Sequence, residues 1–347
     1  LLKKLFNVVI KIYTDQHFIT PENRRCVFPL LFDLCYTKNE QLLSKYELVT
    51  QMEEAVVVIV PLDISEYFQK KQKQWLFDYI DKAIVLHKKV WVYTAGDYGF
   101  SINKKVYTFR LSGFNSKFDA NTFILPSFIE DPYTTIQNQC QPIPKNPLPS
   151  IGFVGHASNS WTKWVKEVLV FLLHNYKRLT KVLFTDYQNF YPSSIKRYKY
   201  LSLLQKNNQI KTDFVFRNQY RAGVKTAQDK QKTTQDFFKN IAANPYIFCL
   251  RGAGNYSVRF YETLAMGRIP FVIDTDFRLP LKGIVNWEEH CILATDTNIC
   301  EALIAFHQKT TAEDFEKMQV KNRNLWLQLL NRESYFTTLS TLFNEKI

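Results

Sequence analysis

The stretch that decides the fold is Tyr246-Ile-Phe-Cys-Leu-Arg-Gly-Ala-Gly-Asn-Tyr-Ser-Val-Arg-Phe-Tyr-Glu262, together with its continuation Gly267-Arg-Ile-Pro-Phe-Val-Ile273. Its apolar first residues predict a strand buried on both faces, and residues 257–266 predict a helix that ends at Gly267. The last residues, 269–273, predict a second buried strand. Strand, helix and strand in this order form a βαβ unit, so we expect a parallel sheet.

The loop between the first strand and the helix has the chemistry of a phosphate site. Gly252 and Gly254 permit dihedral angles closed to other residues and let a ligand approach the backbone. The helix that begins near Ser257 offers unpaired N–H groups and a partial positive charge, which attract anions. A turn shaped only for packing, with Ser257 as the helix cap, accounts for the same residues, so both interpretations stay open here.

Charged side chains around the loop favour the phosphate interpretation. Arg251 and Arg259 flank it and can form bidentate hydrogen bonds with phosphate oxygens. Glu262 lies one turn into the helix and can accept hydrogen bonds from ribose hydroxyls. We therefore expect nucleotide-binding residues at Arg251, Gly252, Gly254, Ser257, Arg259 and Glu262.

The same alternation of strands and helices extends over the whole chain. In the first half, strands are expected at 5–13, 55–60 and 89–94, with a helix over 66–87. The second half adds expected strands at 150–155, 181–185 and 291–295 and expected helices at 161–176, 234–243 (capped by Thr233 or Thr234), 298–307, 311–330 and 333–343. Residues 187–232 suggest no clear element. This pattern predicts an α/β fold with two domains.

A stiff segment separates the two halves. Residues 131–149 hold five of the 13 prolines, which is typical of a linker. We therefore expect domains at 1–140 and 150–330. For a last helix, within 331–347, we expect packing against the first domain.

Basic residues concentrate in the second half. Lys and Arg number 45 against 32 Asp and Glu, a formal net charge of +13. Residues 1–149 hold 18 basic and 15 acidic side chains, whereas 150–347 hold 27 and 17. An anionic partner is therefore expected for the second half. Arg217 is the first candidate, because it follows the apolar run Phe214-Val-Phe216 and can end a strand; Arg221 and Lys225 are the others.

Two classes of protein are disfavoured by composition. Apolar runs fall well short of the roughly 18–20 residues that a transmembrane helix needs. The six cysteines show no CxxC spacing, which argues against a zinc site or a disulfide framework. We therefore expect reduced thiols and a cytoplasmic location, with the inner face of the membrane as the alternative.

Residues 251–287 resemble the C-terminal signature of the exostosin family of glycosyltransferases. The family order is an RG turn, an S-x-R-x-x-E helix, a G-x-I-P strand, an LP pair and a segment with Ile and Trp. This sequence carries the same order in Arg251-Gly252, Ser257 to Glu262, Gly267 to Pro270, Leu279-Pro280 and Ile284 to Trp287. Gly96-Asp-Tyr-Gly99 is similar to the H-D-W-G segment of the family, although Ala95 replaces its His.

The resemblance implies a GT-B fold, in which two Rossmann-like domains face each other across a cleft. It implies an inverting enzyme of polysaccharide biosynthesis that takes a nucleotide-sugar, typically a UDP-sugar, as donor. The second domain then binds the donor, and the first binds a glycan or glycoconjugate acceptor. No cofactor and no metal are expected, because Arg251, Arg259, Arg217 and the Gly252–Ser257 loop can meet the charge of the leaving diphosphate. Asp274-Thr-Asp276 resembles a DxD metal motif, but a turn or a pairing with Arg278 is favoured.

The catalytic base is expected in the first domain. Asp97 follows a strand of that domain and lies at the carboxyl end where α/β proteins bind ligands. A simple turn residue is an equal alternative. Asp15 and His17, just after the first strand, are further candidates. His156, in the second domain, is a weaker candidate for holding the donor or the acceptor.

Two other functions are compatible with the sequence. The positive charge and aromatic content would suit a nucleic-acid-binding α/β protein, but no RRM, KH or zinc pattern appears, so nucleic acid is disfavoured as a partner. A glycan-binding protein without turnover is the second alternative, because of Ala95. Peripheral membrane association is left open by the excess positive charge.

Overall fold

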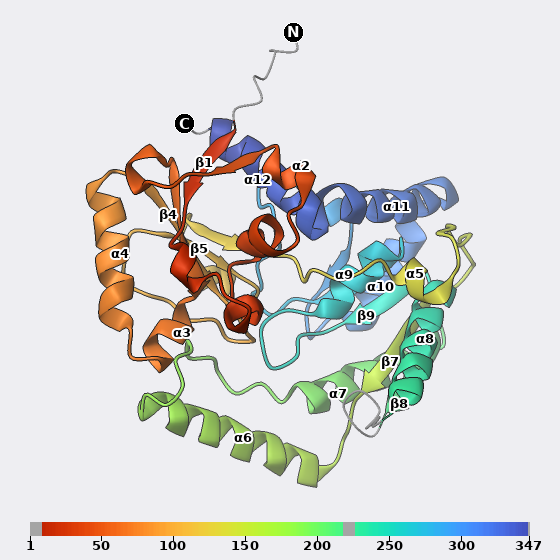
Figure 1. The fold of residues 1–347 in the computed structure, drawn as a ribbon. Helices are drawn as coiled ribbons and strands as arrows, with labels where there is room; N and C mark the ends of the chain where they lie inside the picture. The colour runs from red at the N-terminus through yellow and green to blue at the C-terminus, as the bar shows by residue number, and fades with distance from the viewer. Residues whose placement is uncertain (1–8, 218–225, 346–347) are drawn as a thin grey trace. The chain divides into compact units, whose positions relative to one another are not determined.

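The computed structural model describes residues 9–217 and 226–345, and it is an α/β protein with two parallel sheets (Figure 1). The chain divides into two compact units. The first unit comprises Leu1–Pro126, Asn175–Gln188 and Asn331–Ile347, and the second comprises Ser127–His174 and Asn189–Leu330. The predicted α/β class with two Rossmann-like domains is thereby confirmed.

The first unit is built on a six-stranded sheet in the order β2-β1-β3-β4-β5-β6. All pairings are parallel, as in Val58 opposite Val90. Its strands are β1 (Ile10–Tyr13), β2 (Tyr46–Leu48), β3 (Val57–Asp63), β4 (Lys89–Thr94), β5 (Tyr107–Arg110) and β6 (Thr122–Ile124). Its helices are α1 (Pro29–Leu31), α2 (Glu40–Leu43), α3 (Ile64–Gln69), α4 (Lys73–Val85) and α12 (Arg332–Glu345), with shorter turns η1 (Gln16–Phe18), η2 (Glu22–Arg25), η3 (Phe32–Tyr36), η4 (Met52–Glu54) and η5 (Asn115–Lys117).

The second unit is built on a five-stranded parallel sheet in the order β11-β10-β9-β7-β8. Its strands are β7 (Ser150–His156), β8 (Lys211–Arg217), β9 (Tyr246–Cys249), β10 (Ile269–Ile273) and β11 (Ile292–Ala294). Its helices are α5 (Pro132–Ile136), α7 (Ser193–Lys206), α8 (Ala227–Ala243), α9 (Val258–Ala265), α10 (Ile299–Lys309) and α11 (Ala312–Leu325), with η7 (Trp287–Glu289) and η8 (Trp326–Leu330). The boundary of the two units falls inside α6 (Trp161–Leu179).

Burial explains why the strands are so apolar. Every residue of β3 and β10 is buried, because helices pack on the sheets and leave no wet face. We expected the strand at 55–60 to end at Pro61, but β3 continues to Asp63. A register shift between Ile59 and Asp63 accommodates the proline, which cannot donate to the ladder.

The last helix, α12, belongs to the first unit. The Tyr46 hydroxyl donates to the Phe336 carbonyl oxygen at 2.6 Å, and the Tyr335 hydroxyl donates to the Ile124 carbonyl oxygen at 3.0 Å. Both tyrosines are buried. The chain therefore returns to the first sheet after completing the second.

The first unit ends earlier than the predicted residue 140. The segment after Pro126 is attached to the second unit by side chains rather than left as a free linker. Arg323 donates to Asp131 at 3.0 Å, Tyr133 donates to the Met266 carbonyl oxygen at 3.0 Å, and Arg268 donates to the Gln141 carbonyl oxygen at 3.0 Å. Prolines stiffen this segment, but specific hydrogen bonds position it.

Three element predictions were wrong for local reasons. Residues 181–185 form no strand, because Lys181 is left-handed and the Val182 N–H bonds back to the Lys177 carbonyl oxygen at the end of α6. The helix over 66–87 is two helices separated by the left-handed Lys71. The helix expected at 234–243 begins at Ala227 and is capped by Thr226, which accepts from the Asp229 N–H at 3.1 Å.

Candidate functional site

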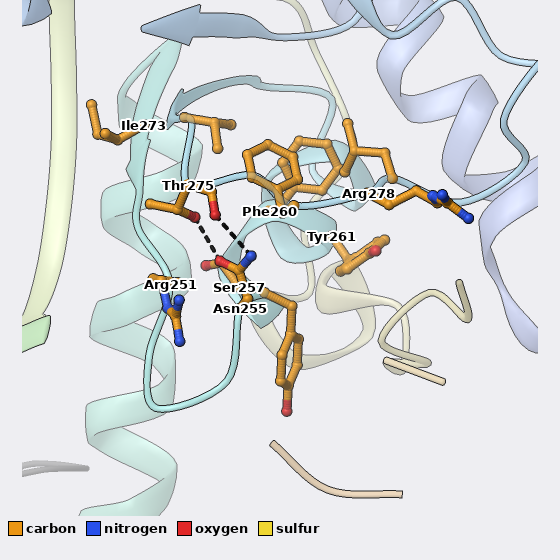
Figure 2. Close-up of a pocket in the computed structure, with 12 residues that line it drawn as sticks. Arg251, Asn255, Ser257, Phe260, Tyr261, Ile273, Thr275 and Arg278 are labelled. Atoms are coloured by element: carbon orange, nitrogen blue, oxygen red, sulfur yellow. Dashed lines mark hydrogen bonds between the residues drawn. The ribbon is translucent and has the colours of Figure 1, made fainter. Parts of the chain in front are cut away.

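The carboxyl ends of three strands meet at one edge of the second sheet. β7 lies between β8 and β9. The chain adds β8 on one side of β7 and the later strands on the other side, so the order of the strands in the sheet reverses at β7. His156 at the end of β7 is opposite Arg217 at the end of β8. Such a switch point is where open α/β sheets bind ligands. The first turn of α9 and the loop after β9 lie at this same edge (Figure 2).

Arg259 is anchored across the edge. It comes from the first turn of α9 and donates through Nη2 to the Val154 carbonyl oxygen at 2.7 Å and through Nη1 to the Phe248 carbonyl oxygen at 3.5 Å. Its guanidinium stacks on the Phe153 ring, 4.3 Å from the centroid. A Cβ at Gly155 would come within 2.9 Å of Nη2, so the small residue makes room for the arginine.

Arg197 is a member of the site that sequence reasoning missed. It projects from α7 and donates to the His156 carbonyl oxygen at 2.7 Å and to the Arg251 carbonyl oxygen at 3.3 Å. Burial, followed by the nearby positive charge of Arg259, lowers the pKa of Arg197 to about 10. No local pattern around residue 197 distinguishes it from the other basic residues of this region.

Arg251 lies directly after β9 and is almost completely buried. Its guanidinium lies over the Tyr191 ring, 4.6 Å from the centroid, and donates to the Ala253 carbonyl oxygen at 2.9 Å. Tyr191 was not predicted either, because it falls in the stretch to which no element was assigned. The aromatic ring supports the cation without neutralising it.

Arg217 is the last residue of β8, and it is half-buried. It donates to the Thr233 carbonyl oxygen at 2.8 Å. Burial lowers the pKa of Arg217, and its positive charge contributes to lowering the pKa of Arg259. The other two candidates, Arg221 and Lys225, lie outside the described residues.

His156 has one nitrogen available at this edge. Its Nδ1 is 2.9 Å from the Arg217 carbonyl oxygen, which can only accept, so Nδ1 carries the hydrogen. Its Nε2 is buried and makes no hydrogen bond within the described chain. A neutral His156 therefore presents an acceptor.

Four arginines, Arg197, Arg217, Arg251 and Arg259, gather at this edge of the second sheet, and we call them the arginine cluster. Within residues 9–217 and 226–345, no carboxylate lies within the 4.0 Å ion-pair distance of Arg197, Arg217 or Arg259. The Nε groups of Arg197 and Arg259 are buried without a hydrogen bond to any described residue. Buried positive charge without an anion is costly, so this arrangement favours an anionic ligand.

The carboxyl group of Glu262 is the candidate counter-charge to the arginine cluster. Burial raises its pKa to about 7, although the positive charge of Arg259 acts to lower it. Its carboxyl group accepts no hydrogen bond from the residues that the structure describes. At neutral pH it therefore neutralises the cluster only in part.

A pocket adjoins the cluster on the side of β10 (Figure 2). It contains about 380 Å³ of empty space, part of it open to solvent. Asn255 holds its wall, because its Nδ2 donates to the Thr275 carbonyl oxygen at 2.9 Å and its Oδ1 accepts from the Thr275 hydroxyl at 2.6 Å. The lining combines polar and aromatic side chains, among them Arg251, Asn255, Tyr256, Ser257, Phe260 and Phe277.

The loop after β9 does not use the left-handed dihedral angles that its glycines permit. Gly252 and Gly254 are not among the positive-φ glycines of the described chain. A Cβ at Gly252 would meet nothing within 4 Å, so neither strain nor packing requires that glycine. Ser257 occupies the N-cap position of α9 but makes no capping hydrogen bond through its side chain, and it lines the pocket instead.

Asp274 and Asp276 form a turn. The Asp276 N–H donates to Asp274 Oδ1 at 2.8 Å, and Asp276 is left-handed. Asn255 donates to the Asp276 carbonyl oxygen at 3.1 Å. Across the described residues, no group of three or more His, Cys, Asp or Glu side chains could hold a metal ion.

The candidate bases lie in the first unit, at the carboxyl edge of its sheet. Asp97 is exposed in the turn after β4. Asp15, after β1, accepts from His17 Nδ1 at 2.8 Å, and His17 is almost fully exposed. A third acid was missed: Asp63 at the end of β3 is buried, accepts from the Ser65 and Ala95 N–H groups, and has its pKa raised by burial.

No protein-family model and no curated protein sequence matches this chain. Among solved structures, it is similar to a glycosyltransferase from Rickettsia africae ESF-5, at 10% identity over 98% of this chain and 99% of that chain, with a TM-score of 0.39. It is also similar to spinosyn rhamnosyltransferase SpnG complexed with thymidine diphosphate, at 7% identity over 96% and 100% of the two chains, with a TM-score of 0.34. Similarity to the GtfA/B complex covers 82% of this chain but 56% of that one, so our chain spans just over half its length (11% identity, TM-score 0.36). Identities this low concern the fold alone and assign no substrate.

Proposed function

We propose that this protein is a GT-B glycosyltransferase whose second unit binds the diphosphate of a nucleotide-sugar. The observation that carries the proposal is the arginine cluster at the carboxyl edge of the second sheet. Three of its members have no carboxylate at ion-pair distance within the described residues, and the cluster lies beside the N-terminus of α9. A diphosphate supplies the missing negative charge and accepts several hydrogen bonds at once.

The neighbouring pocket suits the nucleoside. Phe260 and Phe277 offer apolar surface for a base, and Tyr256 and Ser257 carry hydroxyl groups beside it. Glu262 is assigned to the ribose hydroxyls, as either a hydrogen-bond donor or acceptor near pH 7. A UDP-sugar is proposed on the strength of the exostosin-like signature of residues 251–287, which is also the sole basis for assigning that family.

We assign the acceptor to the first unit. Asp97, exposed at the carboxyl edge of that sheet, is proposed to take the proton from the acceptor hydroxyl of a glycan or glycoconjugate. The deprotonated hydroxyl oxygen attacks the anomeric carbon of the donor as the nucleoside diphosphate leaves. This displacement inverts the configuration at that carbon. The arginine cluster stabilises the negative charge that develops on the leaving diphosphate, and this proposal requires no metal for that role.

Turnover with a panel of nucleotide-sugars tests this function. Donor hydrolysis or transfer should be seen with at least one UDP-sugar and should persist in excess EDTA. Arg251→Ala and Glu262→Ala should each lower turnover, whereas Arg25→Ala, which removes an exposed arginine of the first unit, should not. Unchanged turnover in the first two variants would contradict the donor site, and a strict Mn²⁺ requirement would return attention to Asp274 and Asp276.

A further inference from the structure

Helix α6 presents an apolar stripe to solvent. Its members follow one another at intervals of three or four residues, which places them on one side of the helix: Trp161, Val165, Leu169, Leu172, Tyr176 and Leu179. Five of them are exposed to more than half, with exposed fractions of 70% for Trp161, 60% for Leu169, 56% for Leu172, 65% for Tyr176 and 72% for Leu179. Large apolar residues that gather in this way on a surface indicate an interaction site.

The opposite side of α6 already packs on the protein. Trp164 and Phe171 contact the Phe190 ring, with centroids 6.3 and 5.3 Å apart. Glu167 accepts a short hydrogen bond from the Ser194 hydroxyl. The helix thus packs on the protein through a separate inner face. The apolar stripe is not needed for that packing.

Charge identifies the partner. Residues 161–181 contain five basic side chains and one acidic one, Glu167. The acid lies on the inner face, bonded to Ser194, whereas Lys166 and Lys177 lie on the same side of the helix as Leu173, at one edge of the stripe, and are exposed. The rim of the stripe is therefore cationic.

We propose that α6 lies on an anionic lipid bilayer, with the stripe in the boundary between head groups and acyl chains. Trp161 and Tyr176 have the amphipathic rings that favour this interface, and the lysines can meet lipid phosphates. A second copy of the chain fits less well, because it would bring the same lysines together. None of the described helices is long and apolar enough to cross a membrane. The contact is therefore one along the surface, and it does not depend on the proposed donor site.

Vesicle flotation tests this inference on the full chain. Wild-type protein should float with phosphatidylcholine vesicles that contain about 30% phosphatidylglycerol, and binding should fall at least about tenfold in pure phosphatidylcholine or at about 0.5 M salt. The double change Leu169→Glu with Leu172→Glu should abolish flotation. The double change Lys166→Glu with Lys177→Glu should remove the preference for anionic lipid. Val320→Glu, at a similarly exposed apolar residue on α11, should float like wild type.

Each variant should keep the wild-type circular dichroism spectrum and melting temperature, because these side chains point outward. Absence of flotation by the wild type, or flotation that survives Leu169→Glu with Leu172→Glu, would overturn the proposal. Concentration-dependent dimers that the same double change dissolves, without vesicle binding, would assign the stripe to a second copy instead.

Discussion

The two units use one geometry for opposite charges. In each, parallel strands end at a common edge of the sheet. The edge of the first unit carries the acids Asp15, Asp63 and Asp97, whereas that of the second carries the arginine cluster. The topology of each sheet determines where ligand-binding side chains come together, and the types of those side chains determine which ligand the edge can bind. Acids suit a hydroxyl that must lose a proton, and arginines suit a phosphate.

A buried arginine in the first unit sharpens this contrast. Arg110, at the end of β5, is buried and donates to Asp186 at 3.0 Å. It also donates to the Tyr98 carbonyl oxygen at 2.7 Å. Arg197 in the second unit has equivalent bonds to backbone carbonyls but no carboxylate at ion-pair distance within the described residues. Arg110 is therefore a structural cation, and Arg197 is suited to an external anion.

The largest effect is expected at the acidic edge. Asp97→Asn should lower kcat by about 1000-fold, because it removes the general base, and should leave the Kd for UDP unchanged. Steady-state kinetics and calorimetric titration measure the two quantities. Asp78→Asn, an exposed acid on α4, serves as the matched control and should retain full turnover. Loss of UDP binding in Asp97→Asn would contradict the division of roles between the units.

The second effect concerns pH and Glu262. Its pKa in the folded protein is raised from 4.5 to about 7, so folding favours the protonated form. The protonated Glu262 therefore contributes to the free energy of unfolding, and this contribution is complete below about pH 4.5. It is lost as the pH rises through about 7, and the loss is at most about 3 kcal/mol. Glu262→Gln should remove this decline. Urea unfolding of both proteins at about pH 5 and about pH 8 measures it, and equal slopes with pH would show that Glu262 is not shifted.

The third effect separates the buried Arg110 from the half-buried Arg197. Arg197→Met should raise the Kd for UDP by about 50-fold and change the free energy of unfolding by no more than about 1 kcal/mol. Arg110→Met should instead lower that free energy by about 2–3 kcal/mol, because Asp186 loses its positively charged partner, and should leave the Kd for UDP unchanged. If the two variants behaved alike, the proposed contrast between the edges would be wrong.

The smallest effect is expected at Gly155. An alanine there would place Cβ 2.9 Å from Arg259 Nη2 and displace the guanidinium from the Val154 carbonyl oxygen. The Kd for UDP should rise about tenfold, which corresponds to about 1.4 kcal/mol. Gly152→Ala, on the same strand, is the matched control for bulk, because its Cβ would meet Asn240 and Asn244 at 2.8 Å rather than an arginine, and it should leave the Kd unchanged. An unchanged Kd in Gly155→Ala would mean that the position of Arg259 does not matter for the ligand.

Sequence patterns predicted the buried framework better than the site. The continuous apolar runs at β3, β4, β9 and β10 predict central strands, and those strands are present. Only the end of β8 was anticipated, from the run Phe214-Val-Phe216 before Arg217, because this edge strand has no buried residue and Val215 and Phe216 are exposed. The short strands β5 and β6 carry too few apolar residues to be distinguished from loops.

Within the site, Arg217 at its strand end and the contiguous segment from Arg251 to Glu262 were predictable from local patterns. Arg251 and Arg259 share one strand-loop-helix segment, so their proximity follows from local structure. Arg197 reaches the same edge from α7, and its hydrogen bond to the Arg251 carbonyl oxygen spans 54 positions of sequence. Tyr191, whose ring lies against the Arg251 guanidinium, is even more distant in sequence. Contacts of this kind depend on tertiary packing, which no local spacing reports.

The central claim is that the arginine cluster binds the diphosphate of a nucleotide. Calorimetric titration of the wild-type protein with UDP and with uridine tests it most directly. We predict that UDP binds at least about 100-fold more tightly than uridine and that this difference shrinks as salt is raised from about 0.1 M to about 0.5 M. Equal affinities for UDP and uridine, or no binding of either, would contradict the account.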